Sequence, residues 1–247
     1  MRTYNVCQRT RHLRRCVLFL THTSLVPSQL DVQRLTCMRG GRALFAQVSF
    51  QLQRGQALHL EGDNGVGKTS LLRIVCGLSP ADEGQVHWHS DSCPDFRSAL
   101  FYLGHALSLK EELSALENLL SDAAMAGRSL SEAQAMQALA HMGLRGREHL
   151  PLRVMSQGQK RRTALARLLA SRAELWVLDE PFVALDAPAV NALRTLLADH
   201  VAQGGMVLFT SHQAVSLVSS QGQEVPLLRH RLQVPERAAQ PLQREVA

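Results

Sequence analysis

The sequence predicts an α/β protein with a mostly parallel core sheet, an antiparallel β subdomain and an inserted helical subdomain. Three observations lead to this fold class. A glycine-rich loop at 62–69 joins an apolar strand to a helix, strands and helices alternate after residue 158, and the stretch 110–152 has a helical pattern with little β-signal. Such alternation is typical of parallel sheets, because a crossover helix must return the chain to the same edge.

The N-terminal third supplies the antiparallel part and the first parallel strand. Residues 30–50 hold alternating apolar positions broken at 39–42 by Arg-Gly-Gly-Arg, which predicts a β-hairpin. The apolar run 57–60 is consistent with a buried strand, and a helical pattern follows at 68–77. Residues 81–104 hold turn signals and short strand-like pieces.

The helical stretch predicts a lobe inserted into the core, at about 105–158. Ser131 and Gln134 have the spacing of a capping box, and Leu130 lies where a hydrophobic staple would pack. Helical spacing continues in a predicted packing face formed by Met136, Leu139 and Ala140. Beyond the lobe we expect, in order, a helix at 159–171, a strand at 175–178, a helix at about 187–203 and a strand at 206–209.

Composition limits the function classes. The chain has 247 residues, 45% of them hydrophobic, which suits one large domain. No run approaches the ~20 apolar residues of a membrane span, so work at a membrane would require spans from another chain. The five cysteines are scattered without metal-ligand spacing, which favours free thiols in a reducing compartment.

The positive charge is concentrated at the N-terminus. Of the net charge of +6, five units come from arginines in residues 1–16, where no acid occurs, and 6 − 5 leaves +1 for the rest. We therefore expect no nucleic-acid partner. Residues 1–29 contain no apolar run long enough for a secretory signal, and we interpret them as a disordered or over-extended start. The folded domain is expected over 30–237, followed by a frayed tail at 238–247.

The loop at 62–69 fits G-x-x-x-x-G-K-[ST] in the strand–loop–helix context that a phosphate-binding loop requires. Its glycines let backbone N–H groups turn toward phosphate oxygens, and the helix N-terminus adds a positive dipole. We expect Lys68 to reach the β- and γ-phosphates and Thr69 to bind Mg²⁺. The expected nucleotide-binding set is Gly62, Asp63, Asn64, Gly65, Val66, Gly67, Lys68, Thr69 and Ser70.

A second apolar strand ends in two carboxylates, Asp179 and Glu180. An acidic pair after a strand is usually a helix cap or a solvated turn. Here it lies downstream of a phosphate loop and continues through Pro181 to a further acid at Asp186, which favours catalysis. Asp179 is expected to help hold Mg²⁺, and Glu180 to polarise the attacking water.

Three further motifs point to a family. Residues 155–159, Met-Ser-Gln-Gly-Gln, resemble the L-S-G-G-Q signature of ATP-binding cassette (ABC) ATPases, residues 184–186 resemble the D-loop, and residues 210–212 resemble the strand end that carries the switch histidine. Alone, Ser156 would be an ordinary helix N-cap, but five motifs follow in order across 62–212. The resemblance implies the ABC cassette form of the P-loop NTPase fold, with ATP and Mg²⁺ as cofactors.

The resemblance also implies that two copies of the chain dimerise head to tail and bury two ATP molecules. Each phosphate loop would face the partner's signature residues, Ser156, Gln157, Gly158 and Gln159. His212 would hold the γ-phosphate and the attacking water near Glu180, and Asp186 would serve in the D-loop. Two positions depart from the family: Arg39 stands where an aromatic residue often stacks on adenine, and His105 replaces the glutamine of the Q-loop.

Shorter stretches, 61–73, 101–105, 112–119 and 175–182, look like the haem-exporter ATPases of the bacterial cytochrome c maturation system. That resemblance implies integral membrane partner subunits and a peripheral place on the cytoplasmic face of the inner membrane. An ABC ATPase for another small substrate remains open, because the transported substrate is bound by other subunits. A non-transport ABC ATPase is disfavoured, since the chain holds one cassette without an inserted coiled coil.

Overall fold

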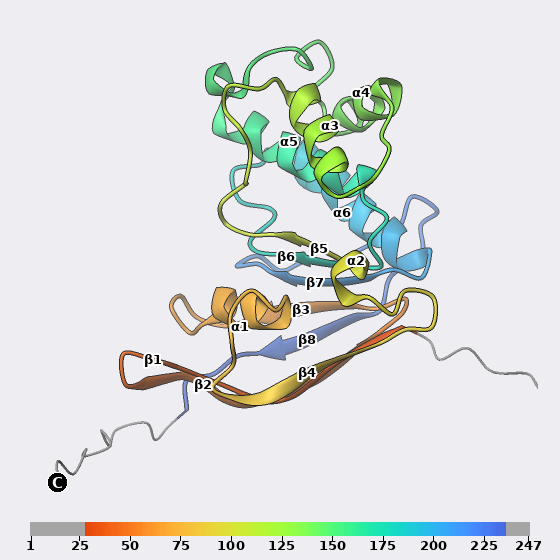
Figure 1. Ribbon diagram of the computed structural model, residues 1–247. Coiled ribbons are helices and arrows are strands. Elements are labelled where there is room, and N and C mark those ends of the chain that lie inside the picture. Colours follow the sequence, from red (N-terminus) through yellow and green to blue (C-terminus); the bar gives the residue numbers. More distant parts are fainter. Residues whose placement is uncertain (1–27, 236–247) are drawn as a thin grey trace, which may run out of the picture.

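The computed structural model describes residues 28–235 of the chain. Two stacked β-sheets form the lower half of the molecule in Figure 1, and a helical lobe stands above them. The expected N-terminal extension, apart from its last two residues, and the expected C-terminal tail lie outside the described residues.

The antiparallel sheet has the strand order β2-β1-β4. Its strands are β1 (Gln29–Arg39), β2 (Arg42–Gln53) and β4 (Glu83–His89). The predicted hairpin is confirmed: β1 and β2 pair antiparallel up to Arg39 opposite Arg42. Gly40 and Gly41 form the turn with φ of 56° and 77°, a left-handed conformation that glycine adopts without steric cost.

The second sheet is wholly parallel, in the order β5-β6-β7-β3-β8. Its strands are β3 (Ala57–Glu61), β5 (Leu100–Leu103), β6 (Leu175–Leu178), β7 (Met206–Thr210) and β8 (Leu227–Arg231). The predicted strands at 57–60, 175–178 and 206–209 are confirmed. The edge strand β8 was not predicted, because two leucines followed by Arg-His-Arg show neither alternation nor a buried apolar run.

Helices flank the parallel sheet and build the lobe. They are α1 (Lys68–Val75), α2 (Phe96–Ala99), α3 (Ala115–Met125), α4 (Glu132–His141), the 3₁₀ helix η1 (Leu152–Val154), α5 (Gln157–Ala170) and α6 (Ala187–Ala202). In the lobe, α3, α4 and α5 pack on one another. The capping box of Ser131 and Gln134 is confirmed, and Leu139 is fully buried on the predicted packing face of α4. The limits of the lobe at about 105–158 stay a prediction.

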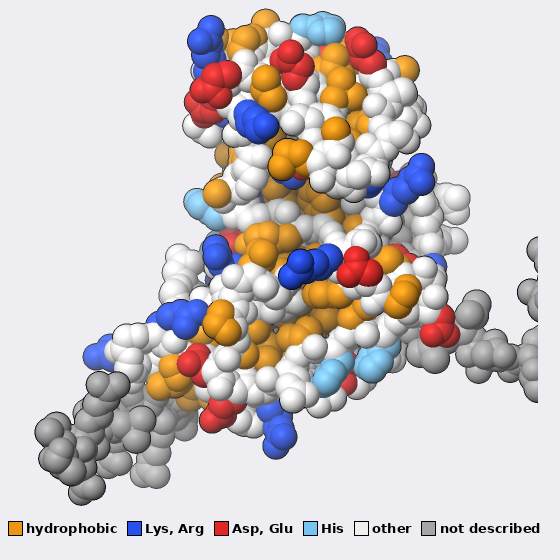
Figure 2. Space-filling model, viewed as in Figure 1, with side chains coloured by type: hydrophobic (Ala, Val, Ile, Leu, Met, Phe, Trp, Pro, Cys, Tyr) orange, Lys and Arg blue, Asp and Glu red, His pale blue; other side chains and the backbone are white. Residues whose placement is uncertain are grey.

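Packing places the functional loops on one side of the molecule. A cluster of buried hydrophobic residues fills the space between the two sheets, and hydrophobic side chains are also visible on the surface across the lower half of Figure 2. Because β3, β6 and β7 are parallel neighbours, the loops that follow their carboxyl ends meet at one edge of the sheet. Within residues 28–235 no helix is long and apolar enough to cross a membrane.

Candidate active site

The phosphate loop leaves β3 at Glu61 and enters α1 at Lys68. Three of its residues have positive φ: 149° at Gly62, 80° at Gly65 and 104° at Gly67. Side chains are excluded for steric reasons as well. A Cβ on Gly67 would lie 3.0 Å from Leu44 Cβ, so this residue needs glycine for both conformation and space.

Lys68 points back into the loop that precedes it. Its ammonium donates to the carbonyl oxygens of Gly62 at 2.7 Å and Asp63 at 3.2 Å, and the residue is 8% exposed. The positive charge is therefore held inside the loop, where we expect phosphate oxygens to bind.

Asp179 lies at the end of β6, 2% exposed, and hydroxyl groups hold both of its carboxylate oxygens. Thr69 donates to Oδ2 at 2.7 Å, and Thr210 donates to Oδ1 at 2.9 Å. The Thr210 hydroxyl in turn accepts the backbone N–H of Glu180 at 2.8 Å. Thr210 thus connects β7 to both acids, a link that the sequence motifs did not reveal.

Glu180 and His212 face each other across this site. Nε2 of His212 lies 3.2 Å from Oε1 of Glu180. The backbone of Glu180 is left-handed, with φ of 50°, which is uncommon for a residue with a side chain. The buried guanidinium of Arg161, on α5, donates to the carbonyl oxygens of Asp179 and Glu180 and so holds the backbone of both acids.

Arg161 is a second residue that the sequence analysis missed. Burial lowers the pKa of its guanidinium, while the charges of Asp179 and Glu180 oppose that shift. In the sequence it is one of three consecutive basic residues after the signature, and nothing local distinguishes it from its two less buried neighbours.

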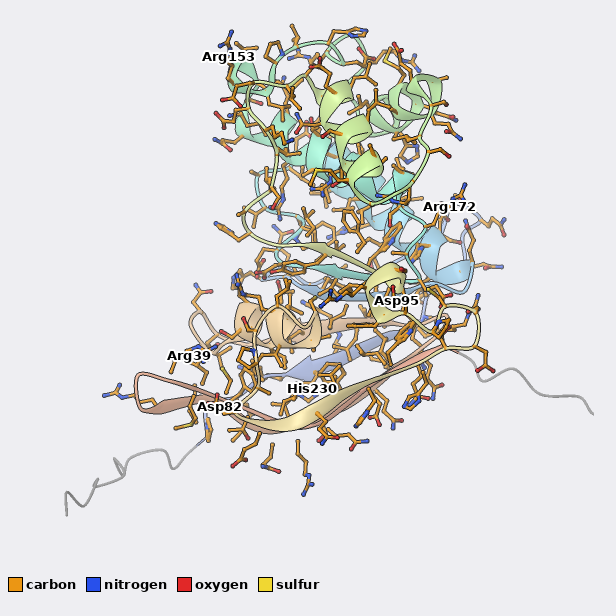
Figure 3. The ribbon with its side chains drawn as sticks, in the orientation of Figure 1. Arg39, Asp82, Asp95, Arg153, Arg172 and His230 are labelled. Carbon is orange, nitrogen blue, oxygen red and sulfur yellow. The ribbon has the colours of Figure 1, made fainter. Side chains whose placement is uncertain are left out.

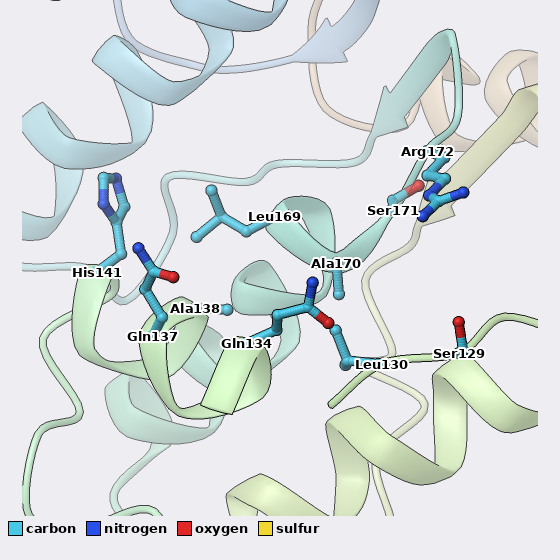
Figure 4. A pocket seen from close by; sticks show the side chains of 10 residues that line it. All are labelled: Ser129, Leu130, Gln134, Gln137, Ala138, His141, Leu169, Ala170, Ser171 and Arg172. Atoms are coloured by element: carbon cyan, nitrogen blue, oxygen red, sulfur yellow. The ribbon is translucent and has the colours of Figure 1, made fainter. Parts of the chain in front are cut away.

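These elements enclose a pocket of about 330 Å³. Its walls bring together most of the predicted phosphate-loop residues, both acids and the switch histidine: Asp63, Asn64, Gly65, Gly67, Lys68, Thr69, Ser70, Asp179, Glu180 and His212, together with Leu44. A separate pocket of about 280 Å³ lies between α4 and the C-terminal end of α5 (Figure 4). No predicted site residue lines it.

The signature residues do not line the chain's own nucleotide pocket. Ser156 is the N-cap of α5 and is exposed. Its hydroxyl accepts the N–H of Gln159 at 3.3 Å, and the Gln159 side chain accepts the N–H of Ser156 at 3.0 Å. The simple N-cap interpretation of Ser156 therefore holds, and it leaves the positive end of a helix open to solvent.

The D-loop packs against the signature helix of the same chain. A Cβ on Gly158 would lie 3.0 Å from the carbonyl oxygen of Ala184, so the two segments touch through backbone. Asp186 caps α6, where its Oδ1 accepts the N–H of Ala189. The same oxygen lies 2.6 Å from Nη2 of Arg162 on α5. The pKa of Asp186 is lowered, first by the Ala189 hydrogen bond and then by Arg162.

Arg39 and His105 lie outside the nucleotide pocket. Arg39 ends β1 at the exposed hairpin, where its guanidinium donates to the carbonyl of Met38; Figure 3 labels it in the lower half of the molecule, far from the lobe. His105 is exposed, two residues beyond β5. The carbonyl of Leu103 accepts the N–H of Asp179 at 2.8 Å, so His105 follows directly on a segment tied to the acidic strand.

Comparisons with known proteins identify the family of the chain. The family model for ABC transporters matches residues 45–183. A cytochrome c biogenesis ATP-binding export protein, CcmA, of Dechloromonas aromatica is 48% identical over 202 residues, which cover 80% of this chain and 99% of the relative. The chain belongs to the CcmA family of ABC transporter ATP-binding proteins. It is an ATP-binding subunit of an ABC transporter.

Solved structures support the fold independently. An ABC transporter ATP-binding protein of Pyrococcus furiosus aligns with a TM-score of 0.69 at 22% identity, covering 83% of this chain and 97% of that one. A dimeric ATP-binding cassette bound to ADP and phosphate aligns with a TM-score of 0.63 at 22% identity, covering 74% and 88%. At these identities the likeness establishes the ABC cassette fold, as the sequence predicted.

Proposed function

We propose that this chain hydrolyses ATP to drive an export step in c-type cytochrome biogenesis. The observation that carries the proposal is the single pocket that joins the phosphate loop, Asp179, Glu180 and His212. A phosphate cradle beside a carboxylate and an imidazole is what hydrolysis of a γ-phosphate requires. The name of the CcmA relative indicates the process, cytochrome c biogenesis and export.

The phosphate loop is proposed to hold ATP through its N–H groups and Lys68. The ammonium exchanges its present carbonyl partners for phosphate oxygens, which are stronger acceptors because they are charged. Thr69 and Asp179 would hold Mg²⁺, because this ion prefers oxygen ligands such as their hydroxyl and carboxylate groups. When bound, Mg²⁺ neutralises charge on the phosphates. Arg39 is proposed as a stacking plane for adenine.

Glu180 is proposed as the group that orients the attacking water and takes its proton. His212, whose ring faces that carboxylate, would hold the γ-phosphate and the attacking water near it. Arg161 and Thr210 support this geometry by fixing the backbone of Glu180 from two sides. Because these two supports come from different elements, α5 and β7, the backbone of Glu180 is held in place before substrate binds.

A second copy of the chain is proposed to complete each site. The positive end of α5 at Ser156 is exposed and lies outside the chain's own pocket, so it is free to meet phosphate held by another copy. Gln157, Gly158 and Gln159 would share that contact, and Asp186 would meet the partner at its D-loop. The two copies would close on ATP and open after hydrolysis.

Integral membrane subunits are the further partners proposed, with haem as the exported cargo and the cytoplasmic face of the inner membrane as the place of work. A groove of about 540 Å³ lined by residues of β5, α3 and α5 is proposed as their docking site. Tyr102 lines it, and the exposed arginines Arg97 and Arg172 stand at its rim. His105, just beyond β5, would pass the nucleotide state to this groove.

Glu180→Gln tests the proposed chemistry. The amide keeps the size of the side chain but cannot take a proton, so hydrolysis should fall by at least ~10²-fold while ATP affinity persists. ATP should then trap a dimer that gel filtration resolves. Glu224→Gln, at an acid outside the pocket, is the matched control and should behave as wild type. Normal turnover of the Glu180 variant would contradict the assignment.

A further inference from the structure

A histidine lies in the buried core, and the proposed chemistry gives it no task. His59 stands in the middle of β3 between two buried leucines and is 2% exposed. A polar ring in such a place needs hydrogen-bond partners to offset its lost hydration. The partners it has belong to segments that border the candidate active site.

Nε2 of His59 lies 3.0 Å from the carbonyl oxygen of Ser211. A carbonyl can only accept, so Nε2 carries the hydrogen and donates it. Ser211 is the first residue after β7, and the next residue is His212. The His59 ring therefore holds the peptide from which the His212 side chain departs.

Stacking on a neighbouring ring also restrains the orientation of the His59 imidazole. The imidazole stacks on Phe209, its register partner on β7, with ring centroids 4.8 Å apart and planes 2° from parallel. Nδ1 lies 3.3 Å from Oε1 of Glu61, and the same oxygen lies 3.3 Å from Nη1 of Arg229 on β8. Stacking therefore sets the plane of the ring and the Ser211 carbonyl sets the direction of Nε2, while Nδ1 makes no hydrogen bond among the described residues.

His212 has much less support of its own. Its side chain is 51% exposed, and Nε2 of its ring lies 3.2 Å from Oε1 of Glu180. The loop beneath it is tightened by the Ser211 hydroxyl, which accepts the N–H of Gln213 at 3.0 Å. The place of the His212 ring thus depends on how the backbone leaves β7.

We propose that His59 is a positioning residue for ATP hydrolysis, whose N–H holds the Ser211 carbonyl and thereby keeps His212 opposite Glu180. This inference rests on the proposed role of His212. His59 is absent from the walls of the nucleotide pocket and lines a neighbouring pocket of about 360 Å³. It should therefore govern turnover and leave the affinity for ATP unchanged.

Two substitutions separate the hydrogen bond from the bulk of the ring. His59→Gln places an amide N–H where Nε2 now lies, whereas His59→Leu fills similar space without a donor. Turnover should fall about tenfold in the leucine variant and stay within about threefold of wild type in the glutamine variant, the scale of one hydrogen bond. Titration with an ATP analogue should give affinities within about twofold for both. If the leucine variant does not fold, His59→Asn replaces it, because its amide is too short to reach Ser211.

The variants are then combined with His212→Ala. In that background His59→Leu should cost less than about twofold, because the residue it positions is gone. Wild-type turnover in His59→Leu, equal losses in the leucine and glutamine variants, or a full loss that persists without His212 would each overturn the inference alone. Normal turnover of His212→Ala by itself would overturn the proposed role of His212, and the inference with it.

Discussion

Thr210→Val tests how the acidic strand is held, because it removes one hydroxyl and little else. Valine has nearly the shape of threonine and suits a strand such as β7. The change deletes the hydrogen bond from Thr210 to Asp179 and leaves the N–H of Glu180 without its acceptor. Thr210 and Asp179 are 0% and 2% exposed, so water has little access to the place of the lost hydroxyl.

The expected cost follows from those two contacts. A hydrogen bond to a charged group contributes about 1.5–3 kcal/mol, and a buried unpaired N–H costs about 1–3 kcal/mol. Because one hydroxyl makes both contacts and the site relaxes in part, we expect a loss of about 3 kcal/mol in the free energy of unfolding. Turnover should fall by at least ~10-fold, since both acids lose their alignment.

Thr163→Val is the matched control. Thr163 is equally buried, and its hydroxyl donates to the carbonyl of Gln159 at 3.0 Å. That carbonyl lies within α5 and keeps its helical N–H partner, so nothing is left unpaired and the cost should stay below about 1 kcal/mol. Urea unfolding and ATPase assays on both variants decide. Equal losses of stability and activity in the two would refute the reasoning.

Three further predictions concern Lys68, His200 and His105. Lys68→Ala should weaken binding of an ATP analogue, because the ammonium neutralises charge already present in the ground state; unchanged affinity in equilibrium titration would contradict the phosphate-loop assignment. Burial lowers the pKa of His200 from 6.5 to about 4, so its stabilising contribution is complete above pH 6.5 and declines as pH falls toward 4. Because of this shift, wild type should lose about 2 kcal/mol in the free energy of unfolding between pH 7 and pH 5. His200→Phe keeps the stack on Trp176 and should not show this loss, which urea unfolding at both pH values measures. His105→Ala should abolish maturation of c-type cytochromes in cells while the purified protein still binds ATP; loss of ATP binding would assign His105 to the nucleotide instead.

Local sequence was enough where one segment carries its own signal. The glycines of the phosphate loop predict a backbone turn, and the apolar run before Asp179 predicts a buried strand, whatever fold surrounds them. The capping box at Ser131 is equally local, since its hydrogen bonds join residues three apart. These elements could therefore be predicted without knowledge of the rest of the chain.

Other features depend on partners that are distant in the sequence. Thr210 bridges to Asp179 across 31 residues, and the Ser211 contact of His59 spans 152. No periodicity or spacing marks such pairs, because they arise when β3, β6 and β7 are laid side by side. The edge strand β8 was missed for the same reason: its backbone pairing with β3 defines it, and its side chains form no pattern.

The central claim is that ATP hydrolysis by this chain drives a step in c-type cytochrome biogenesis. A haem-stained gel of membrane fractions tests it, using a strain that lacks the gene and carries either the wild-type gene or the Glu180→Gln variant. We predict that c-type cytochrome bands disappear in the deletion strain, return with the wild-type gene and stay absent with the variant. Normal bands in the deletion strain would contradict the account and leave an ABC ATPase that serves another small substrate.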